Sequence, residues 1–145
     1  MGMVDVSEKP TIRRMAQATG RIYLSTETMN TIREGKIKKG DPLQAAEIAA
    51  MNAAKQTHLL MPHCHQIPLE TVRVDFEMSE DHVDATCLVR THAKTGVEME
   101  ALVGATMALN TIWDMTKYLE KDKKGQYPST RMTDIKVLKK EKQEA

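Results

Sequence analysis

Aromatic residues are scarce in this sequence: phenylalanine, tryptophan and tyrosine together make up 3% of its 145 residues. Proteins that hold single-stranded RNA or DNA usually stack bases on aromatic side chains, and few such side chains are present here. The formal net charge is only +1, so no overall positive field attracts nucleic acid or an anionic membrane surface. We therefore expect neither nucleic acid nor a membrane among the partners.

Long apolar runs and cysteine clusters are missing as well. Apolar stretches such as residues 59–61 are far too short to cross a bilayer, and the N-terminus lacks the apolar segment of a secretory signal. The two cysteines, Cys64 and Cys87, are too few for a disulfide framework, and no paired cysteine motif indicates structural zinc. These features predict a cytoplasmic protein.

The length suits one domain, residues 1–145, built around one hydrophobic core. Hydrophobic residues at 41% and charged residues at 28% are typical of soluble globular proteins. Residues 1–19 mix charged and scattered apolar side chains around Pro10, which predicts a mobile N-terminal arm. Residues 139–145 are mostly charged, which predicts a frayed tail.

Between these ends the hydrophobic spacing predicts strands alternating with helices. Residues 72–78 and 83–90 alternate apolar and polar side chains around a polar turn, which predicts a hairpin with Cys87 in the core. The other predicted elements are short strands near residues 21–24 and 135–138, and helices at residues 25–35, 41–57 and 95–121. This order predicts an α+β ferredoxin-like sandwich, an antiparallel sheet with helices packed on one face. One small sheet leaves apolar surface to bury, so we also expect oligomerisation.

The long predicted helix, residues 95–121, has two informative rows of side chains. In the polar row, Asp114 and Lys117 lie one turn apart, which fits an ordinary exposed ion pair as well as a functional acid and amine. Gly104 and Ala108 are small enough to let another backbone approach the first half of the helix. The apolar row recurs at spacings of three and four, which predicts a core-facing stripe: Leu102, Ala105, Leu109, Ile112, Met115 and Leu119.

Lys39 and Gly40 lie directly before the helix that Asp41 is expected to cap and Pro42 to begin. A lysine beside the free amides of a helix N-terminus is suited to hold an anion, and phosphate above all. The same residues are also typical of a solvated basic turn. The local pattern leaves both interpretations open.

His63 and His65 flank Cys64 after Pro62. Alternate residues in extended backbone point the same way, so both imidazoles can face one site. Two histidines at this spacing can contribute to a zinc site, but no third or fourth ligand is evident. We therefore favour histidines that bond a polar ligand or are satisfied in the core, and we predict no metal and no cofactor.

Six ordered sequence blocks extend over nearly the whole chain: residues 3–7 (MVDVS), 39–41 (KGD), 53–55 (AAK), 64–65 (CH), 94–102 (KTGVEMEAL) and 114–117 (DMTK). Together they resemble the MoaC family of molybdenum cofactor biosynthesis. The block KTGVEMEAL is the most specific, whereas KGD or DMTK alone is weak. The resemblance implies a ferredoxin-like subunit in a homo-hexamer, built as a trimer of dimers with active sites between subunits. It also implies a lyase activity that converts 3′,8-cyclo-7,8-dihydroguanosine 5′-triphosphate to cyclic pyranopterin monophosphate and pyrophosphate.

The same resemblance implies a set of site residues. Lys39, Asp114 and Lys117 are the implied catalytic residues, with Lys39 stabilising phosphate charge and Lys117 acting in proton transfer. Two alternatives remain: a non-catalytic oligomeric nucleotide-binding module that uses the same lysines to hold phosphate, and a metal-dependent hydrolase centred on the two histidines. The implied substrate-binding residues are His65, Glu98, Glu100, Lys55 and Lys140.

Overall fold

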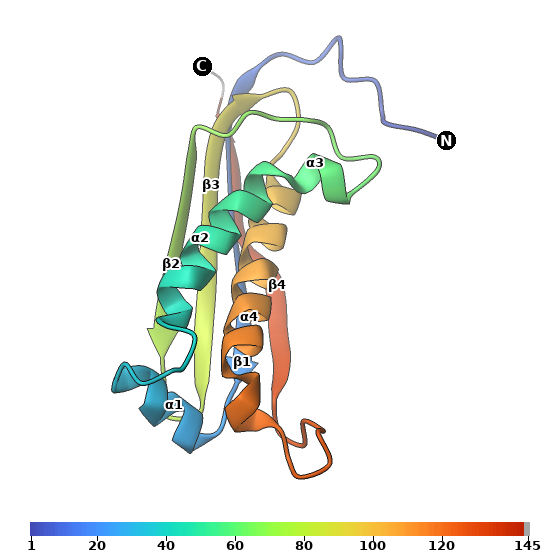
Figure 1. Ribbon diagram of the computed structural model, residues 1–145. Coiled ribbons are helices and arrows are strands. Elements are labelled where there is room, and N and C mark those ends of the chain that lie inside the picture. The colour runs from blue at the N-terminus through green and yellow to red at the C-terminus, as the bar shows by residue number, and fades with distance from the viewer. Residues whose placement is uncertain (144–145) are drawn as a thin grey trace.

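The computed structural model describes residues 1–143 of the chain. Its sheet has the strand order β2-β3-β1-β4 with antiparallel pairing throughout, and helices α2 and α4 pack together across one face (Figure 1). The predicted ferredoxin-like α+β sandwich is confirmed. The elements are β1 (Ile12–Tyr23), α1 (Thr26–Arg33), α2 (Pro42–Lys55), α3 (Thr57–Leu60), β2 (Thr71–Met78), β3 (His82–Ala93), α4 (Glu98–Glu120) and β4 (Arg131–Gln143).

The core lies between the sheet and helices α2 and α4. Alternate residues of β1 and β3 point toward the helices, and many are small, so the helices pack close to the central strands. Cys87 is fully buried here, as predicted. The sheet residues buried in this layer include Ala16, Ala18, Ile22, Val83, Ala85, Cys87 and Val89.

The two predicted N-caps are present. The Ser25 hydroxyl accepts a hydrogen bond from the main-chain N–H of Thr28 at the start of α1. The Asp41 carboxylate accepts from the main-chain N–H groups of Leu43 and Gln44 at the start of α2. Gly40 has a φ of 116°, which only glycine adopts readily, and so turns the chain into this cap.

Helix α4 crosses the middle of the helical layer, and its predicted apolar stripe faces the core. Ala105, Leu109 and Ile112 are fully buried within that stripe. The expected close approach at Gly104 is also present, because a Cβ built there would lie 3.4 Å from the main-chain oxygen of Ala50. The same Cβ would lie 2.5 Å from Sγ of Cys87, so this position needs glycine for packing.

Both predicted chain ends need correction. Strand β1 begins at Ile12, so the mobile-arm prediction is wrong for residues 12–19, and the short strand predicted at residues 21–24 is only the end of β1. The strand pattern is weak in the sequence because Ile22 is the one β-branched residue on the buried face of β1, where alanine and glycine fill most other positions. Strand β4 extends to Gln143, so the frayed-tail prediction is wrong for residues 139–143, while 144 and 145 lie outside the described residues. Its many charges suit an edge strand.

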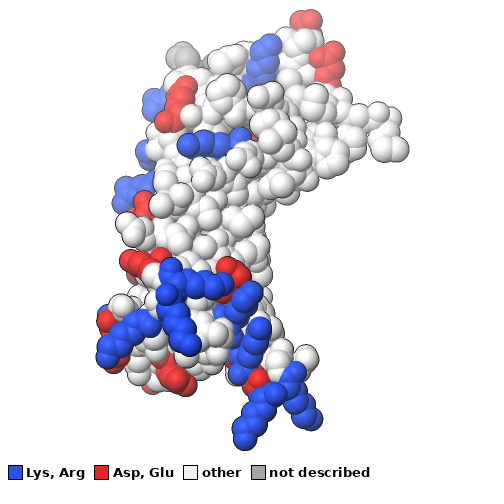
Figure 2. Space-filling view, viewed as in Figure 1, with Lys and Arg blue, Asp and Glu red and all other residues white. Residues whose placement is uncertain are grey.

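Charge is distributed unevenly over the helical face. Figure 2 shows lysine and arginine side chains gathered at the end of the molecule near α1 and the C-terminal end of α4, whereas the middle is largely uncharged. Ile48 of α2 and Leu59 and Leu60 of α3 are exposed apolar side chains. Within residues 1–143, no helix has both the length and the apolar character needed to span a membrane.

Candidate active site

Three predicted catalytic residues meet at the basic end of the helical layer. Asp114 and Lys117 lie one turn apart on α4, and Lys117 Nζ is 3.1 Å from Asp114 Oδ1. Lys39 comes from the turn before α2, and its Nζ is 3.4 Å from Asp114 Oδ2 and 3.3 Å from the Asp114 main-chain oxygen. The pair seen along the helix is therefore part of a three-residue cluster, which we call the lysine–aspartate cluster. A residue 75 positions away completes it.

The electrostatics of this cluster keep its carboxylate charged. The pKa of Asp114 is lowered by the hydrogen bond from Lys117 and by the positive charge of Lys39. All three side chains remain partly exposed. Each ammonium group has three N–H donors, so Lys39 and Lys117 can bind Asp114 and still offer donors to an incoming anion.

A second group of predicted residues lies around the first turn of α4, and we call it the α4 N-terminal cluster. Lys140 Nζ donates to Glu98 Oε2 at 3.3 Å. The contact follows from register: Lys140 pairs with Ala16, whose side chain faces the helices, so Lys140 projects to the same side. His65 lies nearby and its Nε2–H donates to the main-chain oxygen of Val4 at 2.7 Å, which ties the N-terminal segment to this loop.

Glu100 is the most deeply buried acid of the α4 N-terminal cluster, with 2% of its surface exposed. Its Oε2 accepts a hydrogen bond from Sγ of Cys64 at 3.6 Å, and its Oε1 has no hydrogen-bond partner among residues 1–143. Burial raises the pKa of Glu100 above its ordinary value. Burial, together with the negative charge of Glu100, raises the pKa of Cys64 to about 11. Glu100 therefore takes up a proton more readily than an exposed carboxylate does, and the Cys64 thiol keeps its proton as a hydrogen-bond donor.

The remaining predicted residues lie near the same end. His63 and His65 line one hollow of about 400 Å³ together with Cys64, which lies between them. The chain makes a turn at residues 62 and 63 rather than the extended backbone on which the expected shared face rested. Within the described part of the chain, no group of three or more His, Cys, Asp or Glu side chains is arranged to hold a metal ion. Lys55 is exposed at the C-terminal end of α2 and lines a neighbouring hollow with His58 and Gln66.

The two clusters are separated within one chain. Glu98 and Asp114 are 16 positions apart on α4, and at about 1.5 Å per residue their backbones lie about 24 Å apart along the helix axis. The sequence blocks implied that all the predicted site residues surround one substrate molecule. Within one copy of the chain, however, the lysine–aspartate cluster and the α4 N-terminal cluster do not come together.

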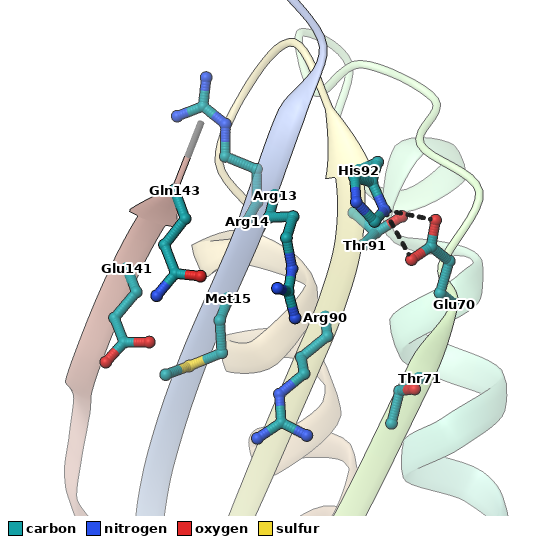
Figure 3. Close-up of a pocket in the computed structure, with 10 residues that line it drawn as sticks. All are labelled: Arg13, Arg14, Met15, Glu70, Thr71, Arg90, Thr91, His92, Glu141 and Gln143. Atoms are coloured by element: carbon teal, nitrogen blue, oxygen red, sulfur yellow. Dashed lines mark hydrogen bonds and ion pairs between the residues drawn. The ribbon is translucent and has the colours of Figure 1, made fainter. Parts of the chain in front are cut away.

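A further hollow, of about 240 Å³, lies on the sheet and contains none of the predicted site residues (Figure 3). It is lined by side chains of β1, β3 and β4, among them Arg13, Arg90 and Glu141. At its edge, His92 Nδ1 lies 3.0 Å from the Glu70 carboxylate. This hollow is separate from both clusters.

Two contacts were not predicted from the sequence. Cys64 was part of a recognised block, but the block gave no sign that its thiol bonds Glu100. Tyr118 follows Asp114 by one helical turn, and its hydroxyl group accepts a hydrogen bond from the main-chain N–H of Lys38, next to Lys39. Its position one turn beyond Asp114 was the only signal available from the sequence.

Comparison with known proteins identifies the family. A model described as the MoaC family matches residues 3–143. A probable cyclic pyranopterin monophosphate synthase of Pyrococcus abyssi is 54% identical over 138 residues, which cover 95% of this chain and 87% of that protein. A protein of Thermococcus kodakarensis with the same name is 53% identical over 142 residues, covering 98% of this chain and 91% of that protein.

A third relative carries a different name. It is a probable cyclic pyranopterin monophosphate synthase accessory protein of Methanothermobacter thermautotrophicus, and it is 52% identical over 142 residues. The match covers 98% of this chain and 89% of that protein. Since the family model and these relatives all extend over almost the full sequence, the chain belongs to the MoaC family.

Proposed function

We propose that this chain is a lyase that converts 3′,8-cyclo-7,8-dihydroguanosine 5′-triphosphate to cyclic pyranopterin monophosphate with release of pyrophosphate. The observation that carries the proposal is the lysine–aspartate cluster, in which Lys39 and Lys117 share Asp114 in a chain of this family. The names of the relatives from Pyrococcus abyssi and Thermococcus kodakarensis support the same reaction. On the resemblance, the reaction takes place in the cytoplasm as a step of molybdenum cofactor biosynthesis.

The chemistry of the lysine–aspartate cluster suits the triphosphate end of this substrate. Loss of pyrophosphate and closure of a cyclic phosphate both concentrate negative charge on oxygen. Two fixed ammonium groups, Lys39 and Lys117, stabilise that charge, and they are already oriented by Asp114 before the substrate arrives. Lys117 also transfers protons during the ring rearrangement, with Asp114 holding its ammonium group in place.

The α4 N-terminal cluster suits the purine-derived end. Glu98 is held by Lys140 and can accept hydrogen bonds from N–H groups of the guanine-like edge. Glu100, whose pKa is raised by burial, can take up a proton and return it to a ring nitrogen or carbonyl group. His65 contributes an imidazole on the same hollow, and Lys55 and Lys140 add positive charge at this end.

We propose that one active site combines the lysine–aspartate cluster of one subunit with the α4 N-terminal cluster of another. The separation of about 24 Å along α4 supports this arrangement, because one substrate molecule cannot reach both clusters of the same chain. The largely uncharged middle of the helical face offers a surface for the second copy (Figure 2). The resemblance favours a homo-hexamer built as a trimer of dimers.

Turnover with the purified protein is the direct test. The protein is incubated with the cyclic triphosphate, and pyranopterin product and pyrophosphate are measured. We expect both products in equal amounts from the natural chain and neither from Lys117→Met. Mixing Lys117→Met with Glu100→Gln subunits and reassembling them should restore part of the activity, because some shared sites then contain neither substitution. Equal inactivity of the mixture would contradict the shared site.

The second candidate is a non-catalytic nucleotide-binding module, which the accessory name of the Methanothermobacter thermautotrophicus relative favours. A binding module of this kind would bind the triphosphate tightly but form no product at any protein concentration. A metal-dependent hydrolase at His63 and His65 is tested in the same assay by adding a chelator. Turnover that survives metal removal excludes a catalytic ion.

A further inference from the structure

The turn that carries Lys39 is attached to the end of α4 through Tyr118. The main-chain N–H of Lys38 donates a hydrogen bond to Oη of Tyr118 at 2.9 Å. The Lys38 ammonium group lies over the same ring, 5.0 Å from its centroid. Tyr118 therefore holds both the backbone and the side chain of the residue directly before Lys39.

Tyr118 is itself firmly placed. Its ring is partly buried and packs against the hydrophobic core, while its hydroxyl group reaches the surface turn. It follows Asp114 by four residues, so the two side chains lie one above the other on the same side of α4. Lys38 therefore contacts Tyr118 and Lys39 contacts Asp114, and these two residues of α4 lie one helical turn apart.

We propose that Tyr118 is a positioning residue that fixes the turn so that Lys39, and not Lys38, meets Asp114. The inference rests on the proposed function for its effect on turnover, but its geometry is independent of that function. Tyr118 does not touch the reacting atoms in this proposal. It acts through Lys39.

The physical reason lies in the weak anchoring of the turn. Lys38, Lys39 and Gly40 are themselves exposed, between the buried Ile37 and the buried Pro42 that begins α2. The turn itself contributes one main-chain hydrogen bond, from the N–H of Gly40 to the oxygen of Ile37, at 3.1 Å. A lysine side chain has many rotamers, so holding its ammonium group at one carboxylate requires a backbone that does not move.

The cation–π contact adds selectivity between neighbours. Lys38 and Lys39 are adjacent, and either flexible side chain can in principle reach the exposed carboxylate of Asp114. The ring of Tyr118 attracts the Lys38 ammonium group and keeps it away from Asp114. Lys39 then occupies Oδ2 while Lys117 occupies Oδ1.

The test uses Tyr118→Phe, which keeps the ring and its packing but removes the hydroxyl group. Asp114 is titrated by carboxyl NMR in four proteins: the natural chain, Tyr118→Phe, Lys39→Met and the double variant. We expect Tyr118→Phe to raise the pKa of Asp114 toward its ordinary value, because Lys39 is no longer held beside it. In the Lys39→Met background the same substitution should leave the titration unchanged, since the residue it acts through is gone.

Turnover provides the second readout. We expect kcat/KM of Tyr118→Phe to fall by about tenfold to a hundredfold, as expected when a catalytic group moves by about 1 Å. Tyr127→Phe is the matched control, because Tyr127 also packs on α4, through Trp113, but makes no hydroxyl hydrogen bond within residues 1–143. It should change neither turnover nor the titration.

The outcomes separate this inference from the proposed function. If the natural chain makes no product, the proposed function fails, and the titrations of Asp114 still decide the role of Tyr118. If Tyr118→Phe shifts Asp114 equally with and without Lys39, the tyrosine has only a general structural role and the proposal is overturned. An unchanged titration and unchanged turnover in Tyr118→Phe overturn it as well.

Discussion

Lys39 and Asp114 are 75 positions apart in the sequence, yet the Lys39 ammonium group contacts both the carboxylate and the main-chain oxygen of Asp114, at 3.4 and 3.3 Å. The helix supplies the aspartate and the turn before α2 supplies the lysine. Lys117 reaches the other carboxylate oxygen, so two amines are held by one acid. Such an arrangement holds two ammonium groups at one place, as the binding of a polyanion would require.

Loss of Lys39 should therefore affect chemistry far more than folding. We expect Lys39→Met to reduce kcat by about a hundredfold or more, the size typical of removing one preorganised group that stabilises charge. Lys36→Met is the matched control, because Lys36 lies in the same loop but pairs with Glu34 at the surface. Steady-state kinetics and thermal unfolding compare the two variants. Equal losses of turnover in both would show that loop charge in general, rather than Lys39, matters.

Glu100 should make the protein less stable as the pH rises. Burial raises the pKa of Glu100 above its ordinary 4.5, so the folded chain binds this proton more tightly than the unfolded chain does. Its contribution is fully present below about pH 4.5 and is lost as the pH rises through the folded pKa. Glu100→Gln should gain stability relative to the natural chain across this interval, as measured by urea unfolding at a series of pH values. Glu47→Gln, at an exposed position of α2, should show no such trend.

The Cys64 thiol should react slowly in the folded protein. Its pKa is raised from 9.0 to about 11, and the thiolate is the reactive form, so alkylation at neutral pH should be about a hundredfold slower than in the unfolded chain. Mass spectrometry after iodoacetamide treatment distinguishes Cys64 from the buried Cys87. Glu100→Gln should speed the reaction at Cys64, because the charge of Glu100 contributes to the raised pKa. A rate equal to that of the unfolded chain would contradict the described environment.

Glu120 should be important for stability rather than for chemistry. This buried carboxylate accepts hydrogen bonds from Ser25, Thr28 and Thr130, and so ties the end of α4 to α1 and to the segment before β4. Glu120→Ala leaves these donors without their acceptor and should lower the free energy of unfolding by about 2 to 4 kcal/mol. Urea unfolding measures the loss, and Glu47→Ala should change the free energy by less than about 0.5 kcal/mol.

Gly104 should resist even the smallest enlargement. An added methyl group would meet Sγ of Cys87 at 2.5 Å and the main chain of α2 at 3.4 Å, so α2 and α4 must move apart. We expect Gly104→Ala to cost about 1 to 3 kcal/mol of unfolding free energy. Combining it with Cys87→Ala removes the closest clash, and the two losses should then be less than additive. Fully additive losses in urea unfolding would contradict the contact.

Features that depend on residues close together in the sequence could be predicted from the sequence. Ser25 and Asp41 as helix caps, the hairpin of β2 and β3, and the buried stripe of α4 follow from side-chain types and their spacing. The extent of β1 did not, because its helix-facing residues are small and its neighbours on both sides are distant in sequence. Strand β4 was underestimated for a similar reason, since pairing to β1 rather than hydrophobicity orders its charged end.

The candidate site also has features that local sequence predicts and features that depend on the tertiary structure. The sequence by itself determined the family and the fold class, and it predicted which lysines and acids take part in the reaction, because the recognised blocks and the helical spacing are local features. Only the tertiary structure decided that Lys39 joins Asp114, that Glu100 is buried beside Cys64, and that Lys140 reaches Glu98. Those contacts depend on sheet register and helix packing, which bring together residues that no local pattern connects. The length of α4, which holds the two clusters about 24 Å apart, follows from the same packed structure.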